Sequence, residues 1–445
     1  MRPFIVSLAL LAGLSACTAV PADLSVNSDD SWRSPGKYDN FIISGEARTP
    51  AGASAVIGIC RTSDGGGYEI LFQGGPVDGT LKTGSLLHVR NIYRTQTEEG
   101  EWFPFEIAVR GRNISVDIAG KPVVCYTEPE NPWRGEGHEG QRIARGRVDF
   151  KGLAGTVDFR GLALEALPQD AVNPGDTLPP VDEQNDGIIR LQQRDFPVID
   201  YHVHLKGGLT KEMAIAKQMN YGINYGVAPN AGWGGVGRML LNDDEVYEYY
   251  DELKDEPFLL GVQGEGRKWN TTFSRKALGV FEYLFTDAMT IIDQKGRNSR
   301  IYRAEEVRMD GLTEDQYMDV IVNETVRILE TEPADIYANP TYIPDCMNDE
   351  YDKFWTDERI DRVLDVLEKY HIALEINPRY KIPSIYVIKK AKERGIKFTF
   401  GTNNGDANFG RLEYALETVE ECGITAEDMW FPPMSIRSRR YLENQ

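Results

Sequence analysis

Apolar and polar positions alternate along many short runs in the first third of the chain. An alternation of period two predicts strands with one buried face, and the Gly-rich turns between the runs favour short antiparallel strands. No convincing helical pattern appears in this region, which is typical of a sandwich or jelly roll. We therefore predict an all-β domain over residues 37–167. The clearest strand candidates are residues 41–47, 68–72, 105–109 and 114–118.

The pattern changes after about residue 188, where short apolar strands alternate with longer helical segments. This alternation predicts a parallel sheet, and the length of the segment favours a distorted β/α barrel, with its chemistry at the carboxyl ends of the strands. We assign residues 195–435 to this α/β domain and the Pro-rich stretch 168–194 to a linker. The predicted strands are residues 198–200, 221–229, 258–262, 334–338, 373–377 and 397–401, and the predicted helices are residues 243–254, 314–330, 357–370, 384–394 and 409–422.

The N-terminal segment has the layout of an export signal. Arg2 precedes an apolar stretch that is too short to span a bilayer, and Leu14-Ser15-Ala16-Cys17 resembles the lipobox of bacterial lipoproteins. We predict cleavage of residues 1–16, acylation of Cys17 and a tether over residues 17–36. The lipid would anchor the protein to a membrane, by default the outer membrane. A plain secretory signal that is cut at another small residue is the alternative.

Composition narrows the choice of partners. The 445 residues carry a net charge of −20, and an acidic surface repels phosphate backbones, so we expect no nucleic-acid partner.

Two of the five cysteines, Cys60 and Cys125, lie in strand-like runs of the first domain. An oxidising compartment would permit a bridge between them, and buried free thiols are the other interpretation.

Two histidines mark the end of the first strand of the second domain. Residues two apart on a strand point the same way, so we expect Asp200, His202 and His204 to converge on one side. The chain contains only five histidines, and this spacing places two imidazoles close enough to share a metal ion. We predict a metal site here, while a satisfied core histidine is the simpler interpretation of either residue alone.

Acids and amides follow the other strands of this domain. We predict Glu265, Glu375 and Asn339 as further metal ligands, and Asp406 or Asp287 as the general base. Imidazole and carboxylate together suit Zn, Mn or Fe, so the predicted cofactor is a divalent metal, as one or two ions. Such a metal would lower the pKa of bound water toward 7 and supply a hydroxide nucleophile.

Cationic side chains stand close to these acids in the sequence. They could hold an anionic or polyhydroxylated substrate, and solvated loop charge is the alternative for each. In the first domain, one tryptophan could stack on a sugar ring or pack in the core. The predicted substrate-binding residues are Lys206, Arg267, Arg379, Lys381, Arg411 and Trp102.

The second domain resembles the PHP (polymerase and histidinol phosphatase) domain of metal-dependent hydrolases, through His202-Val203-His204 and the repeated strand-end ligands. The resemblance implies a distorted seven-stranded β/α barrel with up to three metals, in which Glu265 matches the bridging glutamate. The chain departs from the family where Asn339-Pro340 replaces a His-Pro step and where Asn403-Asn404-Gly405-Asp406 replaces an Asp-Ala-His region. A site with one or two metals, or one that has lost its metal, fits these departures better.

The first domain resembles the 3-keto-disaccharide hydrolase-like family. The residues that carry this resemblance include Gly67-Tyr68-Glu69-Ile70, Thr83-Gly84-Ser85-Leu86, Glu101-Trp102 and Gly155-Thr156-Val157-Asp158-Phe159-Arg160. The resemblance implies a concanavalin-like jelly roll and a link with glycosides and their keto derivatives. Phe103 follows Trp102 where the family usually has Asn.

Together these features predict an exported, metal-dependent hydrolase that acts on a carbohydrate, which is a glycoside, a keto-glycoside or a phosphosugar. Two alternatives stay open. The first is a carbohydrate-binding lipoprotein with a catalytically degenerate barrel, which the amides at the strand ends favour. The second is a glycoside hydrolase or lyase with its active site in the jelly roll.

Overall fold

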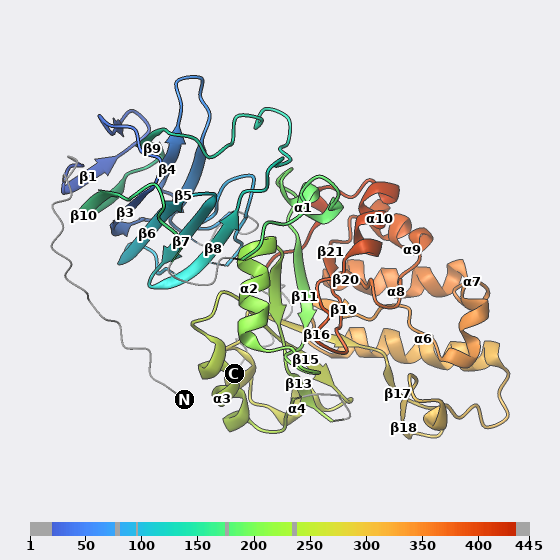
Figure 1. Ribbon diagram of the computed structural model, residues 1–445. Coiled ribbons are helices and arrows are strands. Elements are labelled where there is room, and N and C mark those ends of the chain that lie inside the picture. The colour runs from blue at the N-terminus through green and yellow to red at the C-terminus, as the bar shows by residue number, and fades with distance from the viewer. Residues whose placement is uncertain (1–19, 76–80, 95–96, 174–177, 234–237, 433–445) are drawn as a thin grey trace.

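The computed structural model describes residues 20–75, 81–94, 97–173, 178–233 and 238–432. A β-sandwich is followed along the chain by an α/β barrel (Figure 1). Cys17 and the predicted signal segment lie outside the described residues. Among the helices of the described part, none combines the length and the apolar character needed to cross a membrane.

Two antiparallel sheets form the first domain, as the alternating pattern predicts. Apolar residues of both sheets share one core, in which Phe72 packs edge-on against Phe105 and Phe159. The larger sheet has the order β1 (Asp23–Val26), β10 (Val157–Ala166), β3 (Phe41–Arg48), β6 (Trp102–Arg110), β7 (Asn113–Ile118) and β8 (Lys121–Thr127). The smaller sheet has the order β2 (Ser31–Arg33), β9 (Arg147–Ala154), β4 (Ser54–Arg61) and β5 (Tyr68–Gln73).

The sandwich begins earlier in the chain than the sequence pattern indicates. β1 pairs with β10 and β2 pairs with β9, although both short strands lie in the segment that we expected to be a tether. These strands are too short and too polar to show period two, and pairing with a neighbour stabilises them instead.

Cys60 and Cys125 are buried free thiols, so the bridge that an oxidising compartment would permit is not formed.

Seven parallel strands close into a barrel in the second domain, which confirms the predicted fold class. Strand neighbours follow chain order, and pairing of β12 with β15 completes the ring. The barrel strands are β11 (Ile199–Val203), β12 (Asn224–Val227), β15 (Leu259–Glu265), β16 (Tyr283–Asp287), β19 (Ile336–Ala338), β20 (Ala373–Ile376) and β21 (Phe398–Phe400). Beyond the ring, β13 (Asn230–Gly232) pairs with β15 and with β14 (Met239–Leu240), and β17 (Thr290–Ile292) pairs with β18 (Asn298–Arg300).

Helices surround the barrel (Figure 1), and several begin at a side chain that accepts a free backbone N–H, such as Thr313 and Thr356. The sequence pattern missed α2, because few of its residues are apolar and buried. The α-helices are α1 (Gly187–Gln192), α2 (Lys211–Tyr221), α3 (Asp243–Leu253), α4 (Trp269–Thr272), α5 (Arg275–Leu278), α6 (Glu314–Thr331), α7 (Tyr351–Phe354), α8 (Asp357–Tyr370), α9 (Ile385–Glu393) and α10 (Glu413–Cys422). Short 3-10 helices span Ala304–Glu306, Asp345–Glu350 and Ala426–Asp428.

The end of the barrel at the strand N-termini is closed by aromatic side chains. Tyr201 packs edge-on against Tyr283 and Trp430, with ring centroids 5.3 and 5.4 Å apart. Tyr93 of the sandwich joins this apolar cluster, and its backbone N–H donates to Asn224 Oδ1 at the start of β12. A loop of the first domain therefore seals one end of the barrel, and polar groups concentrate at the opposite end.

The predicted linker makes specific contacts with both domains. Asp186 caps α1, whose apolar residues join the core of the barrel domain. Glu183 is buried and lies 2.8 Å from Arg134 of the sandwich, which donates to the hydroxyl groups of Tyr68 and Tyr126. The linker carboxylate thus covers the main buried polar cluster of the sandwich.

Candidate functional site

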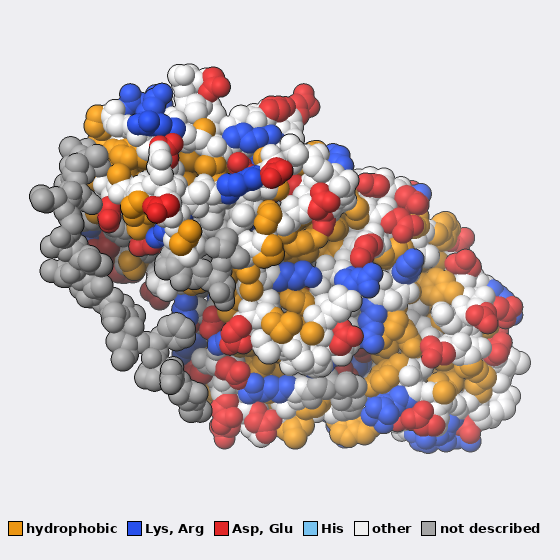
Figure 2. Space-filling view, in the orientation of Figure 1, with side chains coloured by type: hydrophobic (Ala, Val, Ile, Leu, Met, Phe, Trp, Pro, Cys, Tyr) orange, Lys and Arg blue, Asp and Glu red, His pale blue; other side chains and the backbone are white. Residues whose placement is uncertain are grey.

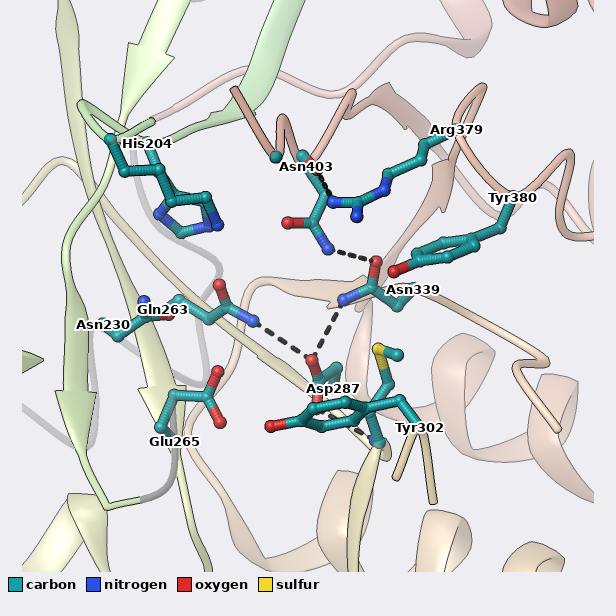
Figure 3. Close-up of a pocket in the computed structure, with 13 residues that line it drawn as sticks. His204, Asn230, Gln263, Glu265, Asp287, Tyr302, Asn339, Arg379, Tyr380 and Asn403 are labelled. Carbon is teal, nitrogen blue, oxygen red and sulfur yellow. Dashed lines mark hydrogen bonds between the residues drawn. The ribbon is translucent and has the colours of Figure 1, made fainter. Parts of the chain in front are cut away.

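A pocket of about 250 Å³ opens at the carboxyl ends of the barrel strands (Figure 3). Parallel β/α folds carry their chemistry at this end, and the lining is rich in carboxyl, amide and cationic groups. The lining residues are His204, Lys206, Asn230, Gln263, Glu265, Asp287, Met289, Tyr302, Asn339, Arg379, Tyr380, Asn403 and Gly405.

A register shift in β11 turns Asp200 away from the two histidines that we expected it to join, whereas the His202 and His204 rings lie close together, with centroids 5.1 Å apart. Pairing with β12 slips between Asp200 and Val203, so that Tyr201 and His202 both contact interior residues. Asp200 instead accepts hydrogen bonds from the backbone N–H and the hydroxyl of Thr402, at 2.9 and 2.5 Å. The expectation that Asp200 joins the two histidines is therefore wrong, because period two does not persist through a bulge.

His202 is buried beneath the pocket, and both of its ring nitrogens are engaged. Nδ1 lies 2.7 Å from Glu375 Oε2, and Nε2 lies 3.1 Å from Gln263 Oε1. Both partners are oxygen atoms of neighbouring side chains, so neither ring nitrogen of His202 is left open toward the pocket. Glu375 Oε1 also accepts from the backbone N–H of Asn339 and from the Asn377 amide. His202 and Glu375 are therefore bonded to each other and are not two free ligands.

Gly401 at the end of β21 makes room for this pair. A Cβ atom at this position would lie 2.2 Å from Glu375 Oε2 and 2.8 Å from His202 Cβ. Such contacts are far inside van der Waals separation, so the position requires a glycine. The strand-end glycine thus belongs to the architecture of the site.

Asp287 is the end point of a chain of amides that all donate in one direction (Figure 3). The backbone N–H of Tyr380 donates to Asn377 Oδ1, so the Asn377 amide donates to Asn339 Oδ1 at 2.9 Å. Asn339 then donates to Asp287 Oδ2 at 3.0 Å, and Gln263 donates to the same oxygen at 3.1 Å. A backbone N–H donates to the other oxygen at 3.0 Å. Three donors on one carboxylate favour its ionised form.

Glu265, at the end of the adjacent strand, has the opposite environment. No hydrogen bond from a described residue reaches its carboxyl group, as Figure 3 shows for the pocket residues. Burial raises the pKa of Glu265 well above its usual range, the charge of Asp287 raises it further, and Arg267 and Lys206 oppose the shift. Burial also raises the pKa of Asp287, but Arg267 and the hydrogen bonds limit that rise. Of the two carboxyl groups, Glu265 therefore takes up a proton first.

Nitrogen groups line the other side of the pocket. His204 Nδ1 donates to the Ala228 carbonyl at 2.8 Å, and the ring also has a side-chain hydrogen bond with Gln263. Burial and the charge of His202 hold the pKa of His204 well below its usual value, so the ring is neutral. Burial, followed by the charge of Arg379, lowers the pKa of Lys206 to about 8. The pocket thus combines a neutral imidazole, a lysine that titrates near neutrality and a permanent cation.

Backbone geometry accounts for two of the amides. Asn339 and Asn403 have φ angles of 43° and 41°, in the left-handed region that asparagine tolerates better than most residues. Each follows a barrel strand, where the chain turns away from the sheet. The Asn403 amide also donates to Asn339 Oδ1 at 2.9 Å. Asparagine at these strand ends therefore has a conformational role as well as a polar one.

The donor set does not fit the predicted metal. His202 and Glu375 bond to each other, and Asn339 Oδ1 accepts from two amides, so these predicted ligands are engaged elsewhere. Within the part of the chain that the structure describes, no three His, Cys, Asp or Glu side chains gather where they could hold a metal ion. His204 and Glu265 alone are fewer ligands than Zn, Mn or Fe sites use. Metal dependence stays a prediction that metal analysis can test.

Four of the predicted residues meet in a neighbouring cavity of about 520 Å³. Lys381, Asp406 and Arg411 line it, and Arg379 lines both this cavity and the main pocket. Asp406 Oδ1 accepts a backbone N–H, and Arg411 Nε lies 3.2 Å from Glu413. Of these four, only Arg379 is placed to touch a substrate that occupies the main pocket.

Two further predicted contacts have local structural explanations. Arg267 lies in the wall of the site, where it pairs with Glu332 at 3.1 Å and donates to the Asp287 carbonyl at 3.2 Å. Trp102 lies on β6 of the sandwich, with the guanidinium carbons of Arg160 and Arg48 at 4.2 and 5.1 Å from its ring centroid. Arginine side chains thus pack against this ring, and stacking of a sugar on Trp102 stays a prediction.

Several pocket residues escaped the sequence analysis. Gln263 lies two residues before Glu265 on the same strand, so period two could have found it. Asn230 stands where the PHP-like resemblance has a ligand-bearing strand end, and it was counted as a departure rather than as a site residue. Tyr302 and Tyr380 come from loops, and only the folded chain brings them to the pocket.

Residues 23–165 match a family described as the 3-keto-alpha-glucoside-1,2-lyase-like domain, so the match covers the sandwich alone. A comparison with curated proteins gives no match.

Solved structures include similar folds for each domain. A candidate glycosyl hydrolase from Parabacteroides distasonis matches over 33% of this chain and 81% of its own, with 15% identity and a TM-score of 0.30. A candidate histidinol phosphatase from Listeria monocytogenes matches over 49% and 98%, with 13% identity and a TM-score of 0.38. A carbohydrate-binding module from Bacillus subtilis matches over 34% and 99%, with 11% identity and a TM-score of 0.23. Similarity at this level carries no argument about function.

Proposed function

We propose that this protein is a carbohydrate-active hydrolase whose reaction takes place in the barrel pocket, with Glu265 as general acid and Asp287 as general base. The observation that carries the proposal is the unequal bonding of two neighbouring carboxyl groups. Asp287 accepts three hydrogen bonds, whereas Glu265 accepts none from the described residues. Two carboxyl groups that are held in different protonation states are the usual machinery of glycoside hydrolysis.

Carbohydrate as the substrate class rests on the family that the sandwich matches. The lining of the pocket agrees with this class. Tyr302 and Tyr380 offer aromatic faces, and Asn230 and Asn403 offer amide groups for hydroxyls. Arg379 adds a permanent cation that suits a keto or anionic oxygen.

The proposed reaction balances without a further reactant besides water. Glu265 gives its proton to the glycosidic oxygen, and the bond from this oxygen to the anomeric carbon breaks with its electron pair going to the oxygen. Asp287 takes a proton from a water molecule, whose oxygen then bonds to the anomeric carbon. The proton on Asp287 returns to Glu265 through solvent, so one water is consumed for each bond that is cleaved.

The test uses the full chain with 3-keto-maltose, maltose and glucose 6-phosphate, and it measures release of sugar and of phosphate. We expect cleavage of a glycoside, and we expect Glu265→Gln and Asp287→Asn each to lower kcat at least about 100-fold. Glu393→Gln, on an exposed face of α9, is the matched control and should leave kcat within twofold. Wild-type kcat in Glu265→Gln would contradict the assignment.

Chelation separates this proposal from the metal-dependent prediction. We expect dialysis against EDTA to leave kcat unchanged, because the predicted ligands are engaged with one another. Elemental analysis of the purified protein before dialysis should find Mn, Fe and Zn well below one ion per chain. Stoichiometric metal that disappears in His202→Ala, together with loss of activity on chelation, would restore the metal-dependent account.

A sugar-capture protein is the second candidate, and the amides of Asn230 and Asn403 in the pocket lining favour it, because amides bind hydroxyls without supplying acid or base. Calorimetry distinguishes the two candidates. Binding of 3-keto-maltose without any turnover supports capture, and turnover that depends on Glu265 supports catalysis.

We also propose that the chain is exported and anchored through Cys17. The apolar stretch and the lipobox-like Leu14-Ser15-Ala16-Cys17 support this. Labelled palmitate supplied to expressing cells should appear in the wild-type chain and not in Cys17→Ser. Equal labelling of both chains would contradict the anchor.

A further inference from the structure

A second cavity, of about 680 Å³, lies directly beside the pocket. Glu265 lines both spaces, so the two cavities share the residue that we propose as general acid. Trp233 and Leu241 also line the second cavity, and they are 55% and 58% exposed. Large apolar side chains with this exposure, gathered in a concave site, are typical of a place where a ligand packs.

Trp233 is held in a fixed relation to Glu265. Its backbone N–H donates to the Glu265 carbonyl at 3.1 Å, and the preceding Gly232 pairs with Glu265 in the β13–β15 ladder. The Arg300 guanidinium carbon lies 5.5 Å from the Trp233 ring centroid. The indole is thus anchored by main chain and by a cation, although more than half of its surface is open.

The rest of the cavity wall supplies groups that hydrogen-bond. Glu324 and Arg327 form an ion pair at 2.8 Å, and Asn298 and Thr272 add an amide and a hydroxyl. A sugar ring has apolar C–H faces and a rim of hydroxyl groups. An exposed indole with carboxylate, guanidinium and amide groups around it matches both properties.

From this geometry we infer that the second cavity is the leaving-group subsite, and that the substrate is a glycoside whose leaving group is itself a sugar. The inference rests on the proposed function, because a general acid stands at the oxygen of the bond that it cleaves. One sugar ring would occupy the main pocket and the next would lie against Trp233, with the shared oxygen at Glu265. A disaccharide or a longer chain therefore fits better than a phosphosugar or a simple alkyl glycoside.

Two substrates with the same first ring test the inference. The full chain is assayed with 3-keto-maltose, whose leaving group is glucose, and with methyl 3-keto-α-glucoside, whose leaving group is methanol. Trp233→Ala should raise KM for 3-keto-maltose about tenfold more than it raises KM for the methyl glycoside. Trp233→Phe keeps an aromatic face and should recover most of the difference. An equal change in KM for both substrates would overturn the inference.

Binding keeps the test independent of turnover. Calorimetry with 3-keto-maltose and the Glu265→Gln chain should show about tenfold weaker binding when Trp233→Ala is added. Tyr386→Ala is the matched control, because Tyr386 is an aromatic residue of 54% exposure on α9. If wild type cleaves neither substrate but Trp233→Ala weakens binding, the proposed function fails, and the second cavity is a sugar-binding site without a leaving group. Unchanged binding in Trp233→Ala overturns the subsite whether or not the protein is an enzyme.

Discussion

At the scale of single residues, the direction of each hydrogen bond decides what the site can do. His202 and Glu375 have the identities of metal ligands, but their polar atoms face each other. The Asn339 amide turns its N–H toward Asp287 and its oxygen toward two other amides. Residue identity alone therefore predicted a metal centre. The orientation of the amides instead directs attention to the carboxyl groups of Glu265 and Asp287, which both line the pocket.

Glu375→Gln tests the buried pair of His202 and Glu375. The amide cannot accept from His202 and from two further donors as the carboxylate does, and it leaves at least one buried polar group without a partner. We expect a loss of about 2 kcal/mol in the free energy of unfolding, measured by urea denaturation. Glu393→Gln on α9 should change it by less than about 0.5 kcal/mol. Equal stability of the two variants would mean that these buried hydrogen bonds do not stabilise the fold.

Lys206 should titrate at lower pH than the other lysines. Burial disfavours its cation, Arg379 disfavours it further, and its pKa lies at about 8. Acetic anhydride labelling with mass-spectrometric readout should therefore show a midpoint near pH 8 for this side chain. Arg379→Met removes one cause and should move the midpoint upward. A midpoint near the ordinary lysine value in the wild type would show that the side chain is solvated.

At the scale of elements, the sequence predicted helices and strands with a regular apolar pattern. It did not predict a strand bulge or short strands that depend on distant partners. α8 spans Asp357–Tyr370 as predicted, because a strong apolar stripe and a capping Thr356 define it. The bulge in β11 carries no mark in the sequence, yet it turns Asp200 away from the histidines. β1 and β2 depend on partners more than a hundred residues away, which local periodicity does not report.

In the candidate site too, some features were predictable from the sequence and others were not. Glu265 and Asp287 were predicted because they end apolar runs, and both line the pocket. The opposite roles of these acids depend on donors that come from other strands, such as the amide of Asn339. The sequence does not show which side chains of different strands will bond to one another. It therefore located the two acids but did not predict which of them holds a proton.

Thr313 tests how much one cap stabilises the longest barrel helix. Its hydroxyl accepts the Gln316 N–H, and the Gln316 side chain accepts the Thr313 N–H, which makes a reciprocal capping box at the start of α6. Thr313→Ala should lower the free energy of unfolding by about 1 kcal/mol in urea denaturation. Thr331→Ala, in the last turn of α6, should cost less, because this hydroxyl bonds only a carbonyl within the helix. The reverse order would contradict the capping argument.

At the scale of the whole molecule, acidic and basic side chains are interspersed on the surface that Figure 2 shows, whereas the pocket holds Lys206 and Arg379 together. A chain with a net charge of −20 thus keeps cations where a substrate would bind.

The two domains are also joined by more than the linker. Arg94 of the sandwich donates to the carbonyls of Lys254 and Glu256 in the barrel domain.

Tyr93 is the contact through which we expect the domains to share stability. The ring lies in the aromatic cluster that closes the barrel, 5.7 Å from the ring of Phe431, on a loop that comes from the sandwich. Tyr93→Ala would leave a cavity beneath the barrel, and loss of a buried aromatic side chain costs about 3 kcal/mol or more. Calorimetry should therefore show one unfolding transition in the wild type and two in this variant, with the barrel unfolding first. Tyr386→Ala, which removes an exposed aromatic ring, should keep a single transition near the wild-type temperature. If Tyr93→Ala also unfolds in one step at that temperature, the sandwich does not support the barrel, and the pocket owes its geometry to the second domain alone.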